Sequence, residues 1–291
     1  VIQMKDFKEL FFETGLIPVI KIESVSMADG LADALLAGGL SVAEITFRTK
    51  AAPQVIEKIA SSHKNIVVGA GTVTTKEEVN AALASGAQFI VSPGFNPSIC
   101  EYCIGKDIPV FPGVNNPSLV EQALSIGLNV LKFFPAEVSG GVKALNALKS
   151  VYQQVSFIPT GGIQENNIRE YMSLNNVLAC GGSWIVAPEL IEAGKFDEIE
   201  RLVKSARRTM MGFLPVVDGN KLSEAAPTNS GGWGSGGGSI EVQTPSLKRT
   251  IAMLAPLGAS IIPGSETVKG KTMVGASVVI PGVKSIIHLV E

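Results

Sequence analysis

Residues 130–137 read VLKFFPAE, and this stretch shows how the chain is organised. The branched and aromatic run Val130–Phe134 predicts a short buried strand, which Pro135 ends. A helical pattern follows at Val142–Leu148 after a turn. A strand, a turn and a helix in this order form one βα unit.

The same unit recurs through residues 1–213. The other predicted strands are Ile17–Ile22, Val42–Phe47, Ile66–Ala70, Phe89–Ser92, Val110–Pro112, Ser156–Thr160 and Val177–Gly181. The other predicted helices include Met27–Leu36, Ala51–Ser61, Lys76–Ser85, Ser118–Ser125 and Asn166–Ser173, with a leading helix at Asp6–Thr14.

This alternation predicts an α/β fold in which crossover helices join parallel strands. Eight units in about 210 residues favour a (β/α)8 TIM barrel near its lower size limit. The alternative is an open doubly wound sheet, which would carry a Gly-rich turn after its first strand. The sequence at that point, IKIESVS at 20–26, contains no glycine, so we predict the barrel for residues 1–213.

A linker and a small extension follow. Residues 230–239 read SGGWGSGGGS, which buries too little apolar surface to order itself, so 214–239 is predicted to be a Gly/Ser-rich linker. Residues 240–291 follow the pattern strand, helix, then two or three strands, which predicts a small C-terminal α+β extension. About 50 residues make a weak independent core, so we expect the extension to pack on the barrel or to pair with another copy.

The composition is that of a compact globular chain, with 46% hydrophobic and 17% charged residues. A net charge of −2 gives no electrostatic argument for a nucleic acid or an anionic membrane as partner. No apolar run approaches the roughly 20 residues that a membrane span needs. The amino-terminal segment lacks a signal-peptide core, and its start at Val1 is consistent with a missing initiator segment.

Three cysteines are too few for a disulfide framework and favour a reducing, cytoplasmic location. Cys100 and Cys103 form a CxxC, but no second CxxC or nearby histidine completes a zinc site. We interpret them as two small residues on one helix face. His63, in the connection SSHKN, is expected to be exposed. We predict neither a metal nor a cofactor.

Polar residues gather where the predicted strands end, and in a barrel these ends line the active site. The polar ones are Glu44, Thr46 and Arg48 in EITFRT, Thr72 in GAGTV, Ser92 in SPG, Lys132 in LKFF, Thr160 in PTGG and Ser183 in GGSW, and the same strand ends carry the apolar residues Pro93 and Phe134. Residues two apart on a strand point to one face, so Glu44, Thr46 and Arg48 are expected to share the inner face.

Lys132 is unusual because it lies inside an apolar strand. Burial disfavours the ammonium form of lysine, and the neutral amine can attack a carbonyl to form a Schiff base. Arg48 would disfavour the ammonium further or would clamp a carboxylate, while Glu44 suits proton transfer. The structural alternative is a core ion pair, either between Lys132 and Glu44 or between Glu44 and Arg48.

Glycine pairs follow the last two predicted strands, Gly161–Gly162 on one and Gly181–Gly182 on the other. A single pair is typical of an ordinary turn. Barrels often bind phosphate at these two loops, where backbone N–H groups and helix amino termini converge. The two pairs together therefore predict a phosphate site.

In this order and spacing, the motifs EITFRT, GAGTV, SPG, LKFFPAE, PTGGI and GGSW resemble the 2-keto-3-deoxy-6-phosphogluconate (KDPG) aldolase family, which includes 4-hydroxy-2-oxoglutarate (KHG) aldolases. The resemblance covers residues 5–213. It implies a homotrimeric (β/α)8 lyase of the Entner–Doudoroff pathway. Such a class I aldolase uses a Schiff base, without a metal, to cleave KDPG reversibly to pyruvate and D-glyceraldehyde 3-phosphate.

The resemblance also implies roles for individual residues. Lys132 matches the Schiff-base lysine and Glu44 the general acid and base. Arg48 and Thr72 match residues at the pyruvate carboxylate, and Pro93 and Phe134 match the apolar wall of the pocket. The region that receives the hydroxylated tail and the phosphate is matched by Thr160, Gly161, Gly162, Gly182 and Ser183.

Other functions compete with this one. An aldolase for the galactonate epimer would differ only at the aldehyde end. A phosphosugar isomerase or epimerase would use a carboxylate base without needing a buried lysine. A non-catalytic trimeric scaffold is the third alternative, although the presence of Lys132, Glu44 and Arg48 argues against it.

The extension resembles, loosely, half of a vicinal oxygen chelate module. His288 is its one plausible metal ligand, and it is more simply interpreted as an ordinary strand histidine. We therefore expect the extension to serve packing or assembly rather than catalysis.

Overall fold

Parallel strands alternate with helices over most of the chain in the computed structural model, which describes residues 4–211, 240–255, 258–269, 272–279 and 287–290. The predicted linker at 214–239 lies outside the described residues. The strands of the first part are β1 (Leu16–Ile20), β2 (Val42–Thr46), β3 (Val67–Gly71), β4 (Ile90–Val91), β5 (Val110–Phe111), β6 (Gly113–Val114), β7 (Val130–Phe133), β8 (Ser156–Pro159) and β9 (Cys180–Gly182). Every strand that the sequence predicts there is present, within a few residues of its expected bounds.

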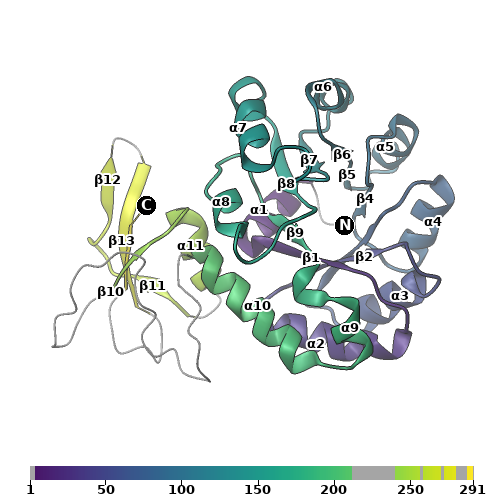
Figure 1. The fold of residues 1–291 in the computed structure, drawn as a ribbon, viewed down its shortest axis with the longest axis horizontal. Helices are drawn as coiled ribbons and strands as arrows, with labels where there is room; N and C mark the ends of the chain where they lie inside the picture. The colour runs from purple at the N-terminus through teal and green to yellow at the C-terminus, as the bar shows by residue number, and fades with distance from the viewer. Residues whose placement is uncertain (1–3, 212–239, 256–257, 270–271, 280–286, 291) are drawn as a thin grey trace.

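The helices lie around the strands, as Figure 1 shows. They are α1 (Met4–Thr14), α2 (Ala28–Gly38), α3 (Ala52–Ser62), α4 (Lys76–Ala84), α5 (Pro97–Ile104), α6 (Pro117–Ser125), α7 (Gly141–Val151), α8 (Ile168–Met172), α9 (Pro188–Glu192) and α10 (Phe196–Met211), with the 3-10 turns η1 (Val25–Met27) and η2 (Trp184–Val186). Local signals begin several of them. Thr75 forms a capping box with Glu78 at α4, and Asn116 caps α6 through the N–H of Leu119.

The strands form two parallel sheets, one in the order β5-β4-β3-β2-β1-β9 and the other β6-β7-β8. Only Pro112 separates β5 from β6, and its carbonyl accepts the N–H of Lys132 at 2.9 Å. At the other side, two parallel bridges, Phe157↔Val177 and Thr160↔Gly181, connect β8 with the chain around β9. The result is a curled parallel sheet.

Four phenylalanines pack where the strands begin. Phe7 and Phe11 of α1 meet Phe89 and Phe111, with ring centroids 5.1–6.0 Å apart in tilted or edge arrangements, which aromatic pairs prefer. Val42, the first residue of β2, belongs to the same buried cluster. Helix α1 therefore covers the amino ends of the strands and leaves their carboxyl ends for a site.

Helix α10 packs against α2 through an apolar stripe. Ile199, Val203, Ala206 and Met210 recur at intervals of three or four, which places them on one face, and all four are buried. A Cβ on Gly38 would lie 2.5 Å from a methyl group of Val203, so this close approach requires glycine.

The carboxy-terminal extension contains β10 (Ile240–Gln243), α11 (Leu247–Leu254), β11 (Ser260–Ile261), β12 (Thr267–Lys269), β13 (Thr272–Val279) and β14 (Ile287–Val290). Its sheet runs β10-β14-β13-β11, and β12 also pairs with β13. Helix α11 contacts α1 and α10, so the extension lies beside these two helices (Figure 1).

Arg249 of α11 makes the most specific contact between the extension and the first part of the chain. Its guanidinium donates to the carbonyls of Phe12 (3.3 Å), Met172 (2.9 Å), Val177 (2.6 Å) and Leu178 (3.1 Å). It also lies 4.5 Å from the ring centroid of Phe12. Arg249 is buried, and this burial lowers its pKa to about 10. The planar guanidinium therefore ties α11 to the ends of α1 and α8.

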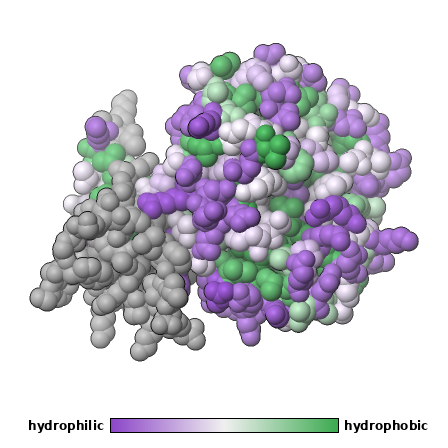
Figure 2. Space-filling view, in the orientation of Figure 1, coloured by the Kyte–Doolittle hydropathy of each residue, from purple (hydrophilic) through white to green (hydrophobic). Residues whose placement is uncertain are grey.

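The surface seen in Figure 2 is largely hydrophilic, with hydrophobic residues scattered in small groups. Val138 and Val151 are the most exposed of the large hydrophobic residues in the described chain. No helix in the described part combines the length and apolar character that a membrane span requires.

Candidate active site

Lys132 on β7 and Glu44 on β2 meet inside the curled sheet. Lys132 Nζ donates to Glu44 Oε1 at 3.2 Å. Both residues are buried, with 5% and 4% of their surfaces exposed. Nζ also lies 5.3 Å from the ring centroid of Phe134, which is half-buried. The structure therefore brings three of the predicted site residues together.

A small cavity adjoins this pair. It has a volume of about 10 Å³, which is roughly the room that one water molecule needs. Its lining consists of Phe11, Ile17, Glu44, Phe89, Val91, Phe111, Lys132 and Ile158. Lys132 and Glu44 are the only charged groups in this lining, so a water there would bond to them.

The contact between Lys132 and Glu44 fits both a core ion pair and a catalytic pair. As a source of stability it is weak, because removing two charges from water costs about as much as their attraction returns, and hydrophobic replacements are often neutral or stabilising. Charged pairs that are buried at the carboxyl ends of strands are more typical of function than of structure.

Glycine at position 71 makes room for the Glu44 carboxylate. A Cβ built on Gly71 would lie 2.1 Å from Glu44 Oε1. The next residue, Thr72, has φ 58°, a left-handed conformation that costs energy in a branched residue. The motif GAGTV suggested Thr72 as a site residue but not this function of Gly71, because only the tertiary contact with β2 reveals it.

Arg48 lies in the turn after β2 rather than on the strand itself, and it is exposed. Its Nε donates to Thr46 Oγ1 at 3.3 Å, and Thr46 Oγ1 donates in turn to the carbonyl of Ile20 at 2.8 Å. Thr46 is buried and lies two residues after Glu44 on β2. Arg48 therefore stands at the open end of the strand, anchored to the inner face through Thr46.

Pro93 follows β4 and lies against the start of β6. A Cβ on Gly113 would lie 2.0 Å from the carbonyl oxygen of Pro93, so these two backbones touch. Ser92 Oγ donates to the carbonyl of Gly94 at 2.8 Å, which fixes the turn around Pro93. The hydroxyl of Ser92 thus donates its hydrogen bond within its own turn.

The two glycine turns lie side by side, since Thr160 bridges to Gly181. Gly161 and Gly162 have φ values of 97° and 81°, which side chains rarely adopt. A Cβ on Gly181 would lie 2.2 Å from Thr160 Oγ1, and one on Gly182 would lie 2.0 Å from the Trp184 ring. Ser183 is exposed at the end of β9. The predicted phosphate region is therefore formed by two backbone segments, 160–162 and 181–183, that lie next to each other.

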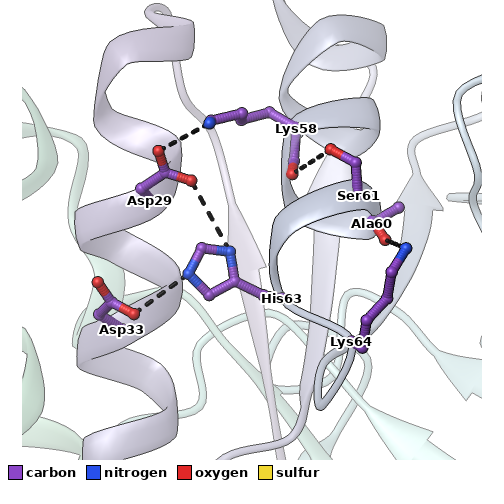
Figure 3. A network of polar contacts seen from close by, with 7 residues as sticks. All are labelled: Asp29, Asp33, Lys58, Ala60, Ser61, His63 and Lys64. Carbon is purple, nitrogen blue, oxygen red and sulfur yellow. Dashed lines mark hydrogen bonds and ion pairs between the residues drawn. The ribbon is translucent and has the colours of Figure 1, made fainter.

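His63 is not exposed, so that prediction was wrong. Its side chain is only 12% exposed, and Figure 3 shows its ring between two helices. Nε2 lies 3.1 Å from Asp33 Oδ1 and Nδ1 lies 3.8 Å from Asp29 Oδ1. Lys58 Nζ approaches Asp29 Oδ2 at 3.0 Å. Two aspartates one helical turn apart on α2 draw the ring inward, a relationship that the local sequence SSHKN does not contain.

Cys100 and Cys103 lie buried on α5, and burial raises the pKa of their thiols to about 11 and about 12. His288 of β14 contacts Ser277 Oγ through Nδ1 at 2.5 Å. Within the described residues, no group of three or more His, Cys, Asp or Glu side chains could hold a metal ion.

Known proteins are similar to this chain in sequence and in fold. A sequence profile described as KDPG and KHG aldolase matches residues 8–202. The chain belongs to this family. The matched segment ends before the carboxy-terminal extension and contains every residue of the candidate site.

Curated relatives agree with the family. A 2-dehydro-3-deoxy-phosphogluconate aldolase from Haemophilus influenzae is 47% identical over 192 residues, which is 66% of this chain and 91% of the relative. A KHG/KDPG aldolase from Escherichia coli K12 is 41% identical over 207 residues, which is 70% of this chain and 97% of the relative.

Solved structures of the KDPG aldolase family are also similar. One is the enzyme from Legionella pneumophila with pyruvate captured as a covalent carbinolamine intermediate. It gives a TM-score of 0.67 at 39% identity, covering 68% of this chain and 97% of the other. The Zymomonas mobilis enzyme with 3-phosphoglycerate gives a TM-score of 0.64 at 36% identity, covering 70% and 95%.

Proposed function

We propose that Lys132 and Glu44 perform the chemistry of a class I aldolase. The protein is an aldehyde-lyase that cleaves KDPG reversibly to pyruvate and D-glyceraldehyde 3-phosphate. The single observation that supports the residue assignment best is the 3.2 Å contact between Lys132 Nζ and Glu44 Oε1 in the buried interior. A buried amine beside a buried carboxylate is the pair that Schiff-base chemistry requires.

Glu44 first accepts a proton from the Lys132 ammonium. The free amine then attacks the C2 ketone, and the resulting carbinolamine loses its hydroxyl as water when Glu44 returns the proton. The product is an iminium, whose positive nitrogen withdraws electrons from the neighbouring carbons. The Phe134 ring, whose centroid lies 5.3 Å from Nζ, forms an apolar wall beside the nitrogen that attacks.

Cleavage of the C3–C4 bond follows from the same two groups. Glu44, acting through a water, takes the proton from the C4 hydroxyl, and the electrons of the C3–C4 bond move into the iminium to give an enamine. Glyceraldehyde 3-phosphate leaves. Protonation of the enamine and hydrolysis release pyruvate and restore Lys132.

Binding of the substrate's carboxylate is assigned to Arg48 and Thr72, and the apolar wall to Pro93 and Phe134. Arg48 is exposed at the strand end, where its guanidinium can form two parallel hydrogen bonds to a carboxylate. The phosphate end is assigned to Thr160, Gly161, Gly162, Gly182 and Ser183. The 3-phosphoglycerate in the Zymomonas relative is consistent with a phosphorylated ligand at this fold.

The test is chemical. Pyruvate is added, the imine is reduced with borohydride, and the adduct is located by mass spectrometry. We expect the adduct on Lys132, and Lys132→Ala should lose both the adduct and cleavage. Arg48→Ala should weaken pyruvate binding far more than phosphate binding, so equal losses for both would contradict its role. An adduct on another lysine would overturn the assignment.

The preferred substrate is a finer question. We propose KDPG with additional activity on KHG, the pair that the name of the Escherichia coli relative carries. Comparing cleavage rates for KDPG, KHG and the galactonate epimer of KDPG tests this order. A faster rate on the galactonate epimer would instead favour the alternative aldolase.

Architecture and assembly complete the proposal. We infer that the curled sheet closes as a (β/α)8 barrel, which the bridges between β8 and β9 support. We further propose a homotrimer, as the family resemblance implies, and a packing role for residues 240–291 through Arg249. Light scattering coupled to size-exclusion chromatography measures the mass of the assembly in solution. The mass of a dimer or a monomer would contradict the proposed trimer.

A further inference from the structure

The glycine turn after β8, residues 160–164, is held by hydrogen bonds at three successive carbonyls. The N–H of Ala136 donates to the carbonyl of Thr160 at 2.8 Å, and the N–H of Glu137 donates to the carbonyl of Gly161 at 3.1 Å. Asn167 Nδ2 donates to the carbonyl of Gly162 at 3.0 Å. Every carbonyl from 160 to 162 therefore has a fixed direction.

These bonds also fix where the amides of the turn point. In a planar trans peptide the N–H points away from the C=O of the same peptide. The N–H groups of Gly161 and Gly162 are thus turned away from Ala136 and Glu137, and the N–H of Ile163 is turned away from the side chain of Asn167. Where successive N–H groups of a turn point into one concave space, they form the kind of backbone site that binds anions.

Asn167 acts on both sides of Ile163. Besides donating to Gly162, its Oδ1 accepts the N–H of Gln164 at 2.9 Å. The one side chain therefore spans the Gly162–Ile163 and Ile163–Gln164 peptides. Gly162 needs such a restraint, because glycine adopts positive and negative φ about equally readily and its peptides rotate easily.

The other wall of the turn leaves little space for movement. A Cβ on Gly162 would lie 2.5 Å from Glu137 Cγ. The carboxylate of Glu137 accepts a short hydrogen bond from the hydroxyl of Tyr171, which directs this negative charge toward α8. The bridge between Thr160 and Gly181 places the second glycine turn beside the first.

We propose that Asn167 is a positioning residue for the phosphate end of the substrate, because it holds the Gly162–Ile163 peptide with its N–H directed toward the bound phosphate. This inference rests on the proposed function. Asn167 itself touches neither the phosphate nor the reacting carbons. Without its Nδ2, the peptide can rotate and present a carbonyl oxygen, which repels the phosphate.

The experiment compares Asn167→Asp with Asn166→Asp. The first change keeps the size of the side chain and the acceptor for Gln164 while it removes the donor to Gly162. The second places the same charge on the adjacent exposed residue and is the matched control. Asn167→Ala removes the donor without adding a charge. Each variant is assayed for KDPG cleavage and, separately, for exchange of the methyl protons of pyruvate and for the borohydride adduct on Lys132.

We expect Asn167→Asp and Asn167→Ala to raise the KM for KDPG about tenfold or more, the scale of one hydrogen bond to a charged group. Proton exchange of pyruvate and the Lys132 adduct should stay within about twofold of the parent, since pyruvate has no phosphate. Asn166→Asp should leave all of these within about twofold.

Two results would overturn the inference. One is an unchanged KM for KDPG in both Asn167 variants. The other is an equal loss of KDPG cleavage and pyruvate exchange, which would mark a general structural effect. If a variant does not fold, Asn167→Ser serves as a milder change, with a hydroxyl that retains partial bonding and an intermediate KM expected. Failure of the proposed function is separate, since the parent protein would then form no adduct on Lys132.

Discussion

Lys132 Nζ and Glu44 Oε1 lie 3.2 Å apart although 88 positions separate the two residues in the chain. Strands β2 and β7 belong to different parallel sheets, so the contact crosses the interior of the curled sheet. It joins the amine that we propose attacks the ketone to the carboxylate that we propose moves the proton.

Removing one member of this pair should destabilise the protein. Lys132→Met leaves the Glu44 carboxylate buried without its cation, and we expect a loss of about 3–5 kcal/mol in the free energy of unfolding near pH 7. The double variant Lys132→Met/Glu44→Leu should recover most of that loss. Denaturant titrations measure both, and a single variant as stable as the parent would show that the pair is well solvated.

Gly71→Ala should impair cleavage through Glu44, because the added Cβ would lie 2.1 Å from Oε1 and force the carboxylate away. We expect the rate of KDPG cleavage to fall by about 100-fold, the scale of losing a general acid–base group. In a Glu44→Ala background the same change should add little. Independent, additive losses in the double variant would contradict this mechanism.

Arg249 should contribute stability that its exposed neighbour does not. Arg249→Met removes the donors to the carbonyls of Phe12, Met172, Val177 and Leu178 and is expected to cost about 3 kcal/mol or more, since buried acceptors lose their partners. Lys248→Ala, whose Nζ lies 5.5 Å from the Phe12 ring, should cost less than about 1 kcal/mol. Thermal unfolding of the full chain distinguishes the two, and equal effects would argue against a specific anchor.

The buried thiols should make the protein sensitive to alkali. Burial raises the pKa of Cys100 to about 11 and those of Cys103 and Cys180 to about 12, whereas an unfolded thiol titrates near 8.5. The folded state therefore binds more protons than the unfolded state above that pH. Stability is fully present below about pH 8.5 and should fall, by up to about 1.4 kcal/mol per pH unit for each thiol, as the pH rises toward the folded values.

Between pH 8.5 and 10 the effect should shrink in Cys103→Ala, which removes one of the three thiols. The informative quantity is the slope of unfolding free energy against pH rather than its absolute value, because the substitution also changes packing. A slope that is identical in parent and variant would show that Cys103 titrates alike in both states.

Several features could be predicted because they are local. Buried parallel strands are short apolar runs, so the eight predicted strands correspond to eight of the nine strands β1 to β9, and only the two-residue β6 was not predicted. The strand-end positions of Glu44, Thr72, Lys132 and Thr160 follow from the same runs. Helix α10 was harder to predict, because no strand follows it. The role of its apolar stripe is seen only when the helix packs against α2.

Other features depend on what the chain brings together. Gly71 matters because the carboxylate of a neighbouring strand fills the place of its missing Cβ, and His63 is covered because two aspartates of α2 face it. Asn167 matters because its side chain donates to the carbonyl of Gly162, and the direction of that carbonyl follows from the conformation of the turn. Sequence by itself determined the order of the βα units and the chemical groups at their carboxyl ends, since apolar periodicity and turns act over a few residues. Only the tertiary structure decided which of those groups touch, because contacts across 88 positions arise from the curling of the sheet rather than from any local pattern.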